Sequence, residues 1–561
     1  MAHASSSRKL NQFGSEALGM ERGGKLHRLA EILRGGLVVN ISVVLALAVG
    51  FFHGWLKLRF RHPATTFAFD VFLLIALALV YLRCGSLKKF IPPGPVGKAL
   101  LALYGLLALY LPFSLLPGTP PFLVAVVAIR SWAFGTLMFC VGYHTIRSPA
   151  QMRAFYFLTI GLAFMTAIYG WRQSPEEIRA MMEADEYYAD RFISQTYATS
   201  QGSGFRIFST FVSSAAYGGT LACTLIFALA FATDRATRPW LRWMLYAAMV
   251  PLAYGVAQSG SRSALAAAAL GGGAVLILRR QWVAIVLAPL ILAGAVLIAG
   301  KASGGTLLER FAELSKMDSV ALRFLFPALI GVEFVLQGHP LGGGLGKAGF
   351  VPLFLAGRTG YTDYVGADGD LGKLLIELGL PGLAIFGWLL WTVGRVNWNY
   401  VRQHASSPIG TLLIAGAANF YISVLTFPIG SPYIGIPLGV MVWFMIGGSQ
   451  KLVELQEAAV HMMPAASAGP AKVGFLGQPL GPLTNRRPER PEASPGAAAV
   501  NPVAPVGVQP PTARPRKRFL YLDAAAEPAG DKAATTSPPP QDTAAPASSR
   551  KRFLYQSQDS R

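Results

Sequence analysis

Two apolar runs flank a short polar turn in residues 241–278, LRWMLYAAMVPLAYGVAQSGSRSALAAAALGGGAVLIL. Each run is close to the ~20 residues that a helix needs to cross a ~30 Å hydrocarbon layer. The turn, Gln258 to Ser263, carries Arg262, and an arginine at the centre of a membrane helix costs about 2.5 kcal/mol or more. Arg262 therefore either snorkels to the lipid headgroups or holds an anion at the membrane surface, and we favour the anion.

The whole chain shares this apolar character. Of its 561 residues, 53% are hydrophobic and 14% are charged, and the mean hydropathy is +0.44, which is typical of polytopic membrane proteins. The net charge of +21 does not indicate nucleic-acid binding, because the basic residues gather between apolar runs and in the termini, as topology signals do. Cys84, Cys140 and Cys223 are isolated in the sequence, which argues against a disulfide framework or a zinc site.

The apolar runs predict an all-α polytopic membrane protein with about twelve transmembrane helices. The expected spans are 36–56, 66–82, 98–117, 120–144, 153–171, 208–232, 241–258, 262–278, 282–300, 371–393, 407–427 and 431–449. A polar and basic segment, 1–35, precedes them, and the first apolar run is too long for a signal-peptide core, so we expect it to be retained as a span. Residues 36–449 would form one membrane domain.

Lysine and arginine in the short loops predict the orientation of these spans. Basic residues before the first span and in five later loops predict that both termini lie in the cytoplasm. Lys57, Arg59 and Arg61 disagree, because this topology puts their loop outside. Two long segments, 172–207 and 301–370, would then face outward, where we expect the chemistry.

The last part of the chain, 450–561, is rich in Pro, Ala and Ser and predicts a disordered cytoplasmic tail. It contains a repeat, because Arg516–Tyr521 and Arg550–Tyr555 both read RKRFLY. Each copy would suit anionic inner-leaflet lipid, at ~1 kcal/mol per basic residue, or a cytoplasmic partner protein. A duplication without a role is the third interpretation.

Three arginines lie on the predicted outer face, against the inside bias of the other cations: Arg206 before the sixth span, Arg262 in the turn and Arg323 in the second outer segment. Guanidinium binds phosphate bidentately and stays charged. Together they favour a lipid-linked pyrophosphate as ligand, whereas each alone would suit a headgroup anchor or a structural ion pair. Arg130 is the clearest charge inside an expected span, and there a buried ion pair and a functional group stay equally open.

Acidic residues gather before the tenth expected span in YTDYVGADGD, Tyr361–Asp370. Asp368 or Asp370 could serve as a general base or a metal ligand, and Tyr364 and Glu377 are further candidates. The alternative for Asp370 is the N-terminal cap of a helix that begins at Leu371, where a carboxylate also suits the helix dipole.

The glycine-rich turn GGGLGKA, Gly342–Ala348, resembles a phosphate cradle but lacks its key residues. Leu341 stands where a P-loop needs its first glycine, and Ala348 replaces the Ser or Thr that holds magnesium. His339, just before this turn, is an isolated candidate, and no zinc signature surrounds it. A mostly apolar helix is expected over Val320–Gln337, which Pro327 would bend or break.

The order of these motifs resembles the O-antigen ligase/polymerase superfamily of bacterial inner-membrane proteins, which have about twelve spans and a large periplasmic loop. The motifs are Arg206 before Phe-Ser-Thr-Phe, then Ser259–Arg262, then Arg323, then GHPLGGGLG at Gly338–Gly346 and ELGLPGL at Glu377–Leu383. The resemblance covers roughly residues 200 to 450, and residues 1–200 agree only in their pattern of spans.

The resemblance implies a metal-independent, cofactor-free glycosyltransferase whose donor is a glycan on undecaprenyl diphosphate. Arg262 and Arg323 would bind the diphosphate leaving group and stabilise its charge, and Arg206 would assist. The segments 172–207 and 301–370 would be periplasmic, the protein would lie in the inner membrane among its lipids, and a chain-length regulator or another polysaccharide-assembly protein would be a candidate partner of the tail.

One departure from the family pattern bears on the choice between two activities. Ligases carry a His-Asn pair about nine residues before the Glu-Leu-Gly motif, and this chain has Asp368-Gly369 there. This favours a polymerase of exopolysaccharide or O-antigen repeats, with Arg262, Arg323 and Asp368 as catalytic residues. The alternatives are a ligase that transfers the glycan to lipid A core or protein and, in another class, a polysaccharide transporter or flippase. A transporter would need ionisable residues and broken helices near the bilayer midplane.

Overall fold

The computed structural model describes residues 36–60, 65, 67–116, 118–184, 196–199, 202–302, 305–312, 317–348, 363–367, 369–433 and 435–462. All of them belong to the first of the two units into which the chain divides, Met1–Leu483. The expected N-terminal segment 1–35, both RKRFLY repeats and Asp368 lie outside the described residues.

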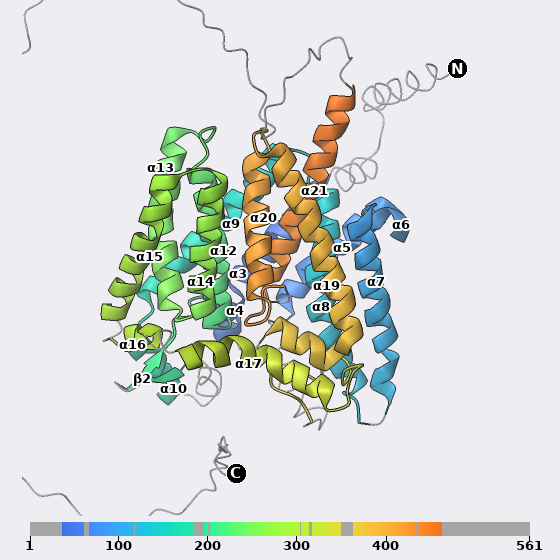
Figure 1. Cartoon of the computed structure of the whole chain (residues 1–561), viewed down its shortest axis with the longest axis horizontal. Coiled ribbons are helices and arrows are strands. Elements are labelled where there is room, and N and C mark those ends of the chain that lie inside the picture. Colours follow the sequence, from blue (N-terminus) through green and yellow to red (C-terminus); the bar gives the residue numbers. More distant parts are fainter. Residues whose placement is uncertain are drawn as a thin grey trace, which may run out of the picture. The chain divides into compact units, whose positions relative to one another are not determined.

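The described secondary-structure elements are helices apart from one short hairpin (Figure 1). The first helices are α3 (Leu37–Phe51), α4 (His53–Phe60), α5 (Ala68–Cys84), α6 (Leu87–Phe90), α7 (Pro95–Tyr110), the 3-10 helix η2 (Pro112–Leu115), α8 (Phe122–Thr145), α9 (Pro149–Arg172) and α10 (Pro175–Ala184). The hairpin joins β1 (Thr196–Thr199) to β2 (Gly202–Phe205) as an antiparallel pair, with Thr196 opposite Phe205.

Helices continue after the hairpin to the end of the described chain. They are α12 (Ser214–Ala232), α13 (Pro239–Gln258), α14 (Arg262–Leu278), α15 (Trp282–Ala302), α16 (Thr306–Ala312), α17 (Met317–Leu336), α19 (Asp370–His404), α20 (Gly410–Thr426) and α21 (Leu438–Met462). Helix α21 runs past 450, where we expected the tail to begin, and α17 continues through Pro327 without a break.

Five described helices are long and apolar enough to cross a membrane: α7 with η2, α8, α9, α12 and α19. Helices α3 and α4, which meet at a 67° bend, make a sixth candidate if they count as one span. The outer surface supports a membrane environment, since Leu82, Trp243 and Trp391 are each more than 70% exposed although large apolar side chains normally avoid water. The chain is therefore a membrane-embedded helical protein.

Close helix packing depends on small residues, as is usual in membranes. A side chain at Gly142 of α8 would collide with the Phe444 carbonyl of α21, and one at Gly447 of α21 would collide with the Phe139 carbonyl of α8. Buried aromatic rings fill the spaces around this seam, among them Trp132 and Trp443, which are almost fully enclosed. The core therefore runs through the middle of the bundle.

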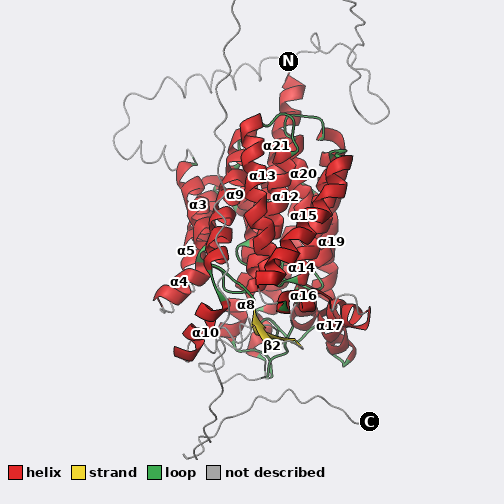
Figure 2. Cartoon of the chain, turned by 90° about the vertical axis from the view of Figure 1, so that its left-hand side faces the viewer, coloured by secondary structure: helices red, strands yellow, loops and turns green. Residues whose placement is uncertain are grey.

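One end of the bundle carries most of the non-crossing elements. Helices α4, α10, α16 and α17 and the β hairpin all lie there (Figures 1 and 2). Helix α17 runs across this end, roughly perpendicular to the long helices (Figure 1). The two long segments that we expected to share one face, 172–207 and 301–370, thus bring their described elements to the same end of the helices, which we call the α17 end.

Candidate functional site

The turn with Arg262 is a tight connection between two antiparallel helices at the α17 end. Helix α13 ends at Gln258, and α14 begins at Arg262 after Gly260, whose φ of 59° lies in the left-handed region that favours glycine. The Ser261 hydroxyl accepts a hydrogen bond from Ala264 N and so caps α14. Helix capping thus explains the glycine and the serine of this turn. It does not explain why an arginine, the half-buried Arg262, stands at the start of α14.

Arg206 lies in a segment that is bonded directly to this turn. Ile207 N donates a hydrogen bond to Gln258 O over 3.3 Å, which brings the residue after Arg206 against the last residue of α13. The Arg206 side chain, like that of Arg262, is half-buried. Two of the three arginines singled out in the sequence therefore occupy adjoining backbone segments.

The motif after Arg206 is held in a strained turn. Ser209 has a φ of 53°, which is rare for a residue with a side chain. Its amide donates to the Gln173 side chain over 3.0 Å, and its hydroxyl donates to Thr166 O over 2.6 Å. Strain of this kind costs about 1–3 kcal/mol and persists where the surroundings enforce it. Helix α9 thus fixes the conformation of the segment that carries Arg206.

Helix α4 packs against the same segment and adds further cations. Trp55 N donates to Thr210 O over 3.0 Å, and the Thr210 hydroxyl donates to Phe51 O over 2.7 Å. Gly54 is required here, because a Cβ would approach Phe211 O to 2.0 Å. Lys57 and Arg59, which disagreed with the predicted topology, belong to this helix at the α17 end, whereas Arg61 lies outside the described residues.

Arg323 belongs to the first half of α17, and its side chain lies outside what the structure describes. The helix is fixed to α19 farther along, where Gly331 allows close contact with Gly372 and Leu375. The α17 end thus gathers the segments of all three predicted arginines, together with two cations on α4. The same end also carries the glutamates of α10, so the positive charge that could attract an anion lies on the arginine segments and α4 rather than over the whole end.

Asp370 serves the packing of the α17 end. It is the first residue of α19 after the cap residue Gly369, and it is completely buried. Its Oδ2 accepts a hydrogen bond from Tyr433 N over 3.0 Å, while its own amide donates to Gly430 O over 2.9 Å. The predicted N-cap role of Asp370 is wrong, because Gly369 is the cap residue and the carboxylate instead ties α19 to the loop before α21.

Glu377 is also completely buried, and both of its carboxylate oxygens have donors. Trp132 Nε1 donates to Oε2 over 2.7 Å, and Gly346 N donates to Oε1 over 3.2 Å. The ammonium of Lys373 lies 3.9 Å from Oε1 and 5.7 Å from the Trp132 ring centroid. This arrangement fixes α8, α19 and the glycine-rich turn to one another.

The glycine-rich turn and the ELGLPGL motif meet at a break in α19. At Gly379 the backbone leaves the helical conformation, with φ 59° and ψ −151°, and this frees backbone groups of the helix. The loop before it fills the gap: Gly343 N donates to Ile376 O over 2.7 Å, Gly344 N to Glu377 O over 3.2 Å, and Leu380 N to Pro340 O over 2.8 Å.

This contact explains why the turn resembles a phosphate cradle without its key residues. Amides that would face a phosphate in such a cradle are bonded instead to the broken helix. Neither glycine at the contact accepts a side chain, because a Cβ on Gly379 would lie 2.3 Å from Pro340 O and one on Gly342 would lie 2.7 Å from Glu377 O. Sequence reasoning treated these motifs as separate, since no local pattern reveals their pairing.

His339 and Tyr364 lie in the neighbouring loops. The His339 ring stacks on Phe334 at the end of α17, with ring centroids 4.5 Å apart and an interplanar angle of 17°. Tyr364 is half-buried in the short segment 363–367, which pairs with the glycine-rich loop through Val365 N and Lys347 O at 2.9 Å. His339 borders a cavity of about 430 Å³.

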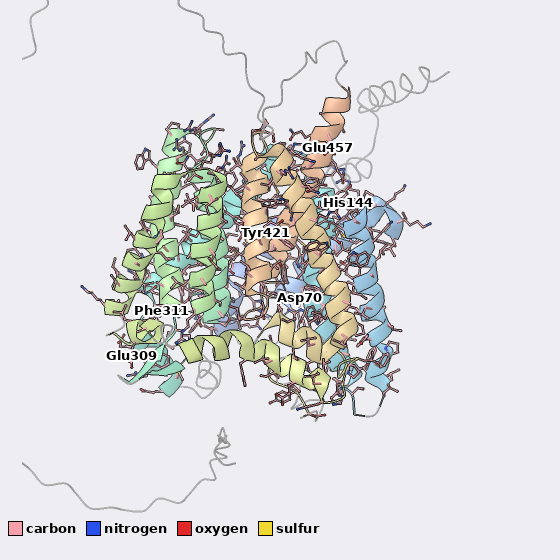
Figure 3. The ribbon with its side chains drawn as sticks, viewed as in Figure 1. Asp70, His144, Glu309, Phe311, Tyr421 and Glu457 are labelled. Atoms are coloured by element: carbon pink, nitrogen blue, oxygen red, sulfur yellow. The ribbon has the colours of Figure 1, made fainter. Side chains whose placement is uncertain are left out.

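Arg130 forms a buried ion pair, which is one of the two roles that the sequence left open for it. Its Nε donates to Asp70 Oδ1 over 2.8 Å, and Asp70 is 4% exposed. Figure 3 places Asp70 inside the bundle, in the half nearer α17. Arg130 is therefore not the single clear charge within the expected spans, and the signal that we missed was the lone acid in the apolar run 66–82.

Other ionisable groups lie at the opposite end, where Figure 3 places His144 and Glu457. There Tyr143 donates to Glu454 Oε2 over 2.6 Å and Lys451 lies 4.9 Å from the Tyr143 ring centroid. Within the described ranges, no three His, Cys, Asp or Glu side chains gather as a metal site would require. The cysteines are free thiols, and Cys140 and Cys223 are buried.

No model of a known protein family matches this chain, and no curated protein matches it in sequence.

Proposed function

We propose that this protein is an integral-membrane glycosyltransferase that polymerises undecaprenyl-diphosphate-linked oligosaccharide repeats into exopolysaccharide or O-antigen. The observation that carries the proposal is the hydrogen bond between Ile207 N and Gln258 O, because it joins the segments of Arg206 and Arg262. The order of motifs, which resembles the O-antigen ligase/polymerase superfamily, supports the same activity.

The proposed topology has twelve spans. These are α3, α5, α7, α8, α9, α12, α13, α14, α15, α19, α20 and α21. The α17 end would face the periplasm of a bacterial inner membrane, and both termini would be cytoplasmic, as the basic loops predict. Lys57 and Arg59 would then be periplasmic because they serve the anion site rather than the orientation.

In the proposed reaction, an acceptor hydroxyl oxygen attacks the anomeric carbon of the donor glycan. The bond between that carbon and the diphosphate oxygen breaks, and undecaprenyl diphosphate leaves with the bonding electrons. Arg206, Arg262 and Arg323 stabilise the charge that develops on the leaving group. The hydroxyl proton passes to a carboxylate, for which Asp368 is the candidate, since Asp370 and Glu377 bind backbone and indole donors in the core.

A transporter would need ionisable residues and broken helices near the bilayer midplane. The structure has Arg130 within a span, paired with Asp70 at 2.8 Å, and a break in α19 at Gly379 that the glycine-rich loop fills. A buried ion pair of this kind is compatible with a structural role.

The test is Arg262→Ala in a strain that lacks the native gene, with polymer length and lipid-linked glycans as readouts. Polymer is expected to disappear and single lipid-linked repeats to accumulate, while the protein level in the membrane is unchanged. Arg402→Ala is the matched control, because Arg402 is an exposed arginine near the other end of α19. Polymer of normal length in Arg262→Ala cells would refute the proposal.

A further inference from the structure

A cavity of about 430 Å³ lies at the α17 end, against the glycine-rich loop. Its lining comes from three parts of the chain: Tyr110 and Thr119 beside η2, Phe334 and His339 around the end of α17, and Lys347 with Asp363 in the loops that follow. A cavity of this size is in the range of small-molecule sites. We call it the loop cavity.

Two stacked aromatic pairs contribute to the walls. Tyr110 stacks on Phe113 with centroids 5.3 Å apart, and Phe334 stacks on His339 with centroids 4.5 Å apart. The Tyr110 hydroxyl is fixed in place, since its one proton is shared between Leu341 O at 2.7 Å and Leu378 O at 3.1 Å. The Tyr110 side of the cavity is therefore fixed, and the stacked rings offer flat faces that suit the C–H faces of a sugar ring.

The polar groups of the loop cavity are balanced in charge. Lys347 and Asp363 form an ion pair; the Lys347 side chain is 10% exposed and that of Asp363 is 74% exposed. The exposed carboxylate can accept hydrogen bonds from hydroxyl groups, and the pair as a whole is neutral.

The loop backbone offers few donors to an anion. Gly342 N donates to His339 O, Gly343 N to Ile376 O, Gly344 N to Glu377 O and Lys347 N to Gly344 O. A phosphate site would need such amides free. The loop cavity thus differs in chemistry from the arginine segments at the same end of the protein.

We propose that the loop cavity binds a neutral sugar of the glycan, which rests on the proposed glycosyltransferase function. Helix α17 connects it to the anion site, since Arg323 and Phe334 are eleven residues apart on one helix, or roughly 16 Å along its axis at 1.5 Å per residue. The diphosphate and a more distant sugar would then be held by opposite halves of the same helix.

The test measures binding directly, without any reaction. The full-length protein in lipid nanodiscs is titrated with neutral oligosaccharides of two to four sugars, prepared by partial hydrolysis of the cells' own polysaccharide, and binding is followed by saturation-transfer NMR. Phe334→Ala is expected to weaken binding about tenfold, because it removes one ring and frees its stacking partner. Phe326→Ala is the matched control, since Phe326 is an exposed phenylalanine of the same helix that does not line the loop cavity.

Two further probes separate the possible failures. Farnesyl diphosphate tests for a polyprenyl chain: if Phe334→Ala weakens its binding and leaves sugar binding unchanged, the loop cavity is a lipid site and the inference is wrong. Unchanged sugar binding in Phe334→Ala and His339→Ala, in protein that unfolds at the wild-type temperature, also overturns it. Arg262→Ala should retain sugar binding, so polymer formed by that variant would overturn the proposed function alone.

Discussion

The Trp132 indole nitrogen donates a hydrogen bond to the Glu377 carboxylate over 2.7 Å, and both side chains are shielded from solvent. The second oxygen of the carboxylate accepts from Gly346 N. Glu377 was a candidate for chemistry in the sequence, but a carboxylate enclosed in this way joins three parts of the chain. Its loss should therefore affect stability before activity.

Replacement of Glu377 by alanine is expected to lower the unfolding temperature strongly, because it leaves the buried indole and amide donors unpaired at about 1–3 kcal/mol each. Glu377→Gln should be milder, since the amide keeps one acceptor oxygen. Tryptophan fluorescence during heating of the detergent-purified protein measures both. Glu333→Ala, at an exposed acid of α17, should change little. A catalytic role would instead appear as lost polymer at an unchanged unfolding temperature.

Gly379→Ala should prevent correct folding of the glycine-rich loop. The backbone conformation at this position is nearly restricted to glycine, at about 1–3 kcal/mol for other residues, and the new methyl would lie 2.3 Å from Pro340 O. We expect low yield of monodisperse protein in size-exclusion chromatography. Gly387→Ala provides the comparison, because it is in the same helix and its added methyl meets nothing within 4 Å. Equal yields would mean that the helix break is not needed.

Single substitutions of the Arg130–Asp70 pair should each destabilise the protein more than the double substitution does. Removing one partner of a buried pair costs about 3–5 kcal/mol, whereas replacing both by apolar side chains can be neutral. Arg130→Met, Asp70→Leu and the combination should be compared by thermal unfolding. A double variant that is as stable as wild type but makes no polymer would assign the pair to function.

The proposed orientation predicts opposite labelling of two exposed loops. With Cys84 replaced by alanine, Gly366→Cys should react with a membrane-impermeant maleimide in intact cells, and Ser406→Cys should react only after the membrane is opened. Both positions are exposed, and the native Cys140 and Cys223 are buried. The reverse pattern would invert the topology, and labelling of both in intact cells would show that the two ends share one side.

Most helices could be predicted from the sequence, because an apolar run indicates a helix locally, whatever the rest of the chain contacts. The turn at Gln258 and the helix over Val320–Gln337 are found nearly where they were expected. Pro327 did not break α17, and α21 extends beyond the last apolar run to Met462. Polar residues can continue a helix once its apolar part is fixed, so composition locates the end of a span better than the end of a helix.

The contacts of the site were less accessible to sequence reasoning. Arg206 and Arg262 are joined through backbone atoms, which have no sequence signature. Asp70 and Arg130 are 60 residues apart, and only the rarity of acids in apolar runs hinted at a partner. Asp370 and Glu377 looked reactive because the sequence does not reveal that Tyr433 N and Trp132 occupy them.

The contact between the glycine-rich loop and the broken α19 has a consequence for how this protein can vary. Each segment supplies hydrogen-bond partners that the other lacks. The amides of Gly343 and Gly344 donate to the carbonyls of Ile376 and Glu377, and the Pro340 carbonyl accepts from the Leu380 amide. A chimera that receives one segment from a relative and keeps the other would lose backbone hydrogen bonds in both segments. Residues 338–346 and 376–382 should therefore be exchanged together, because they form one structural unit although they are separate in the sequence.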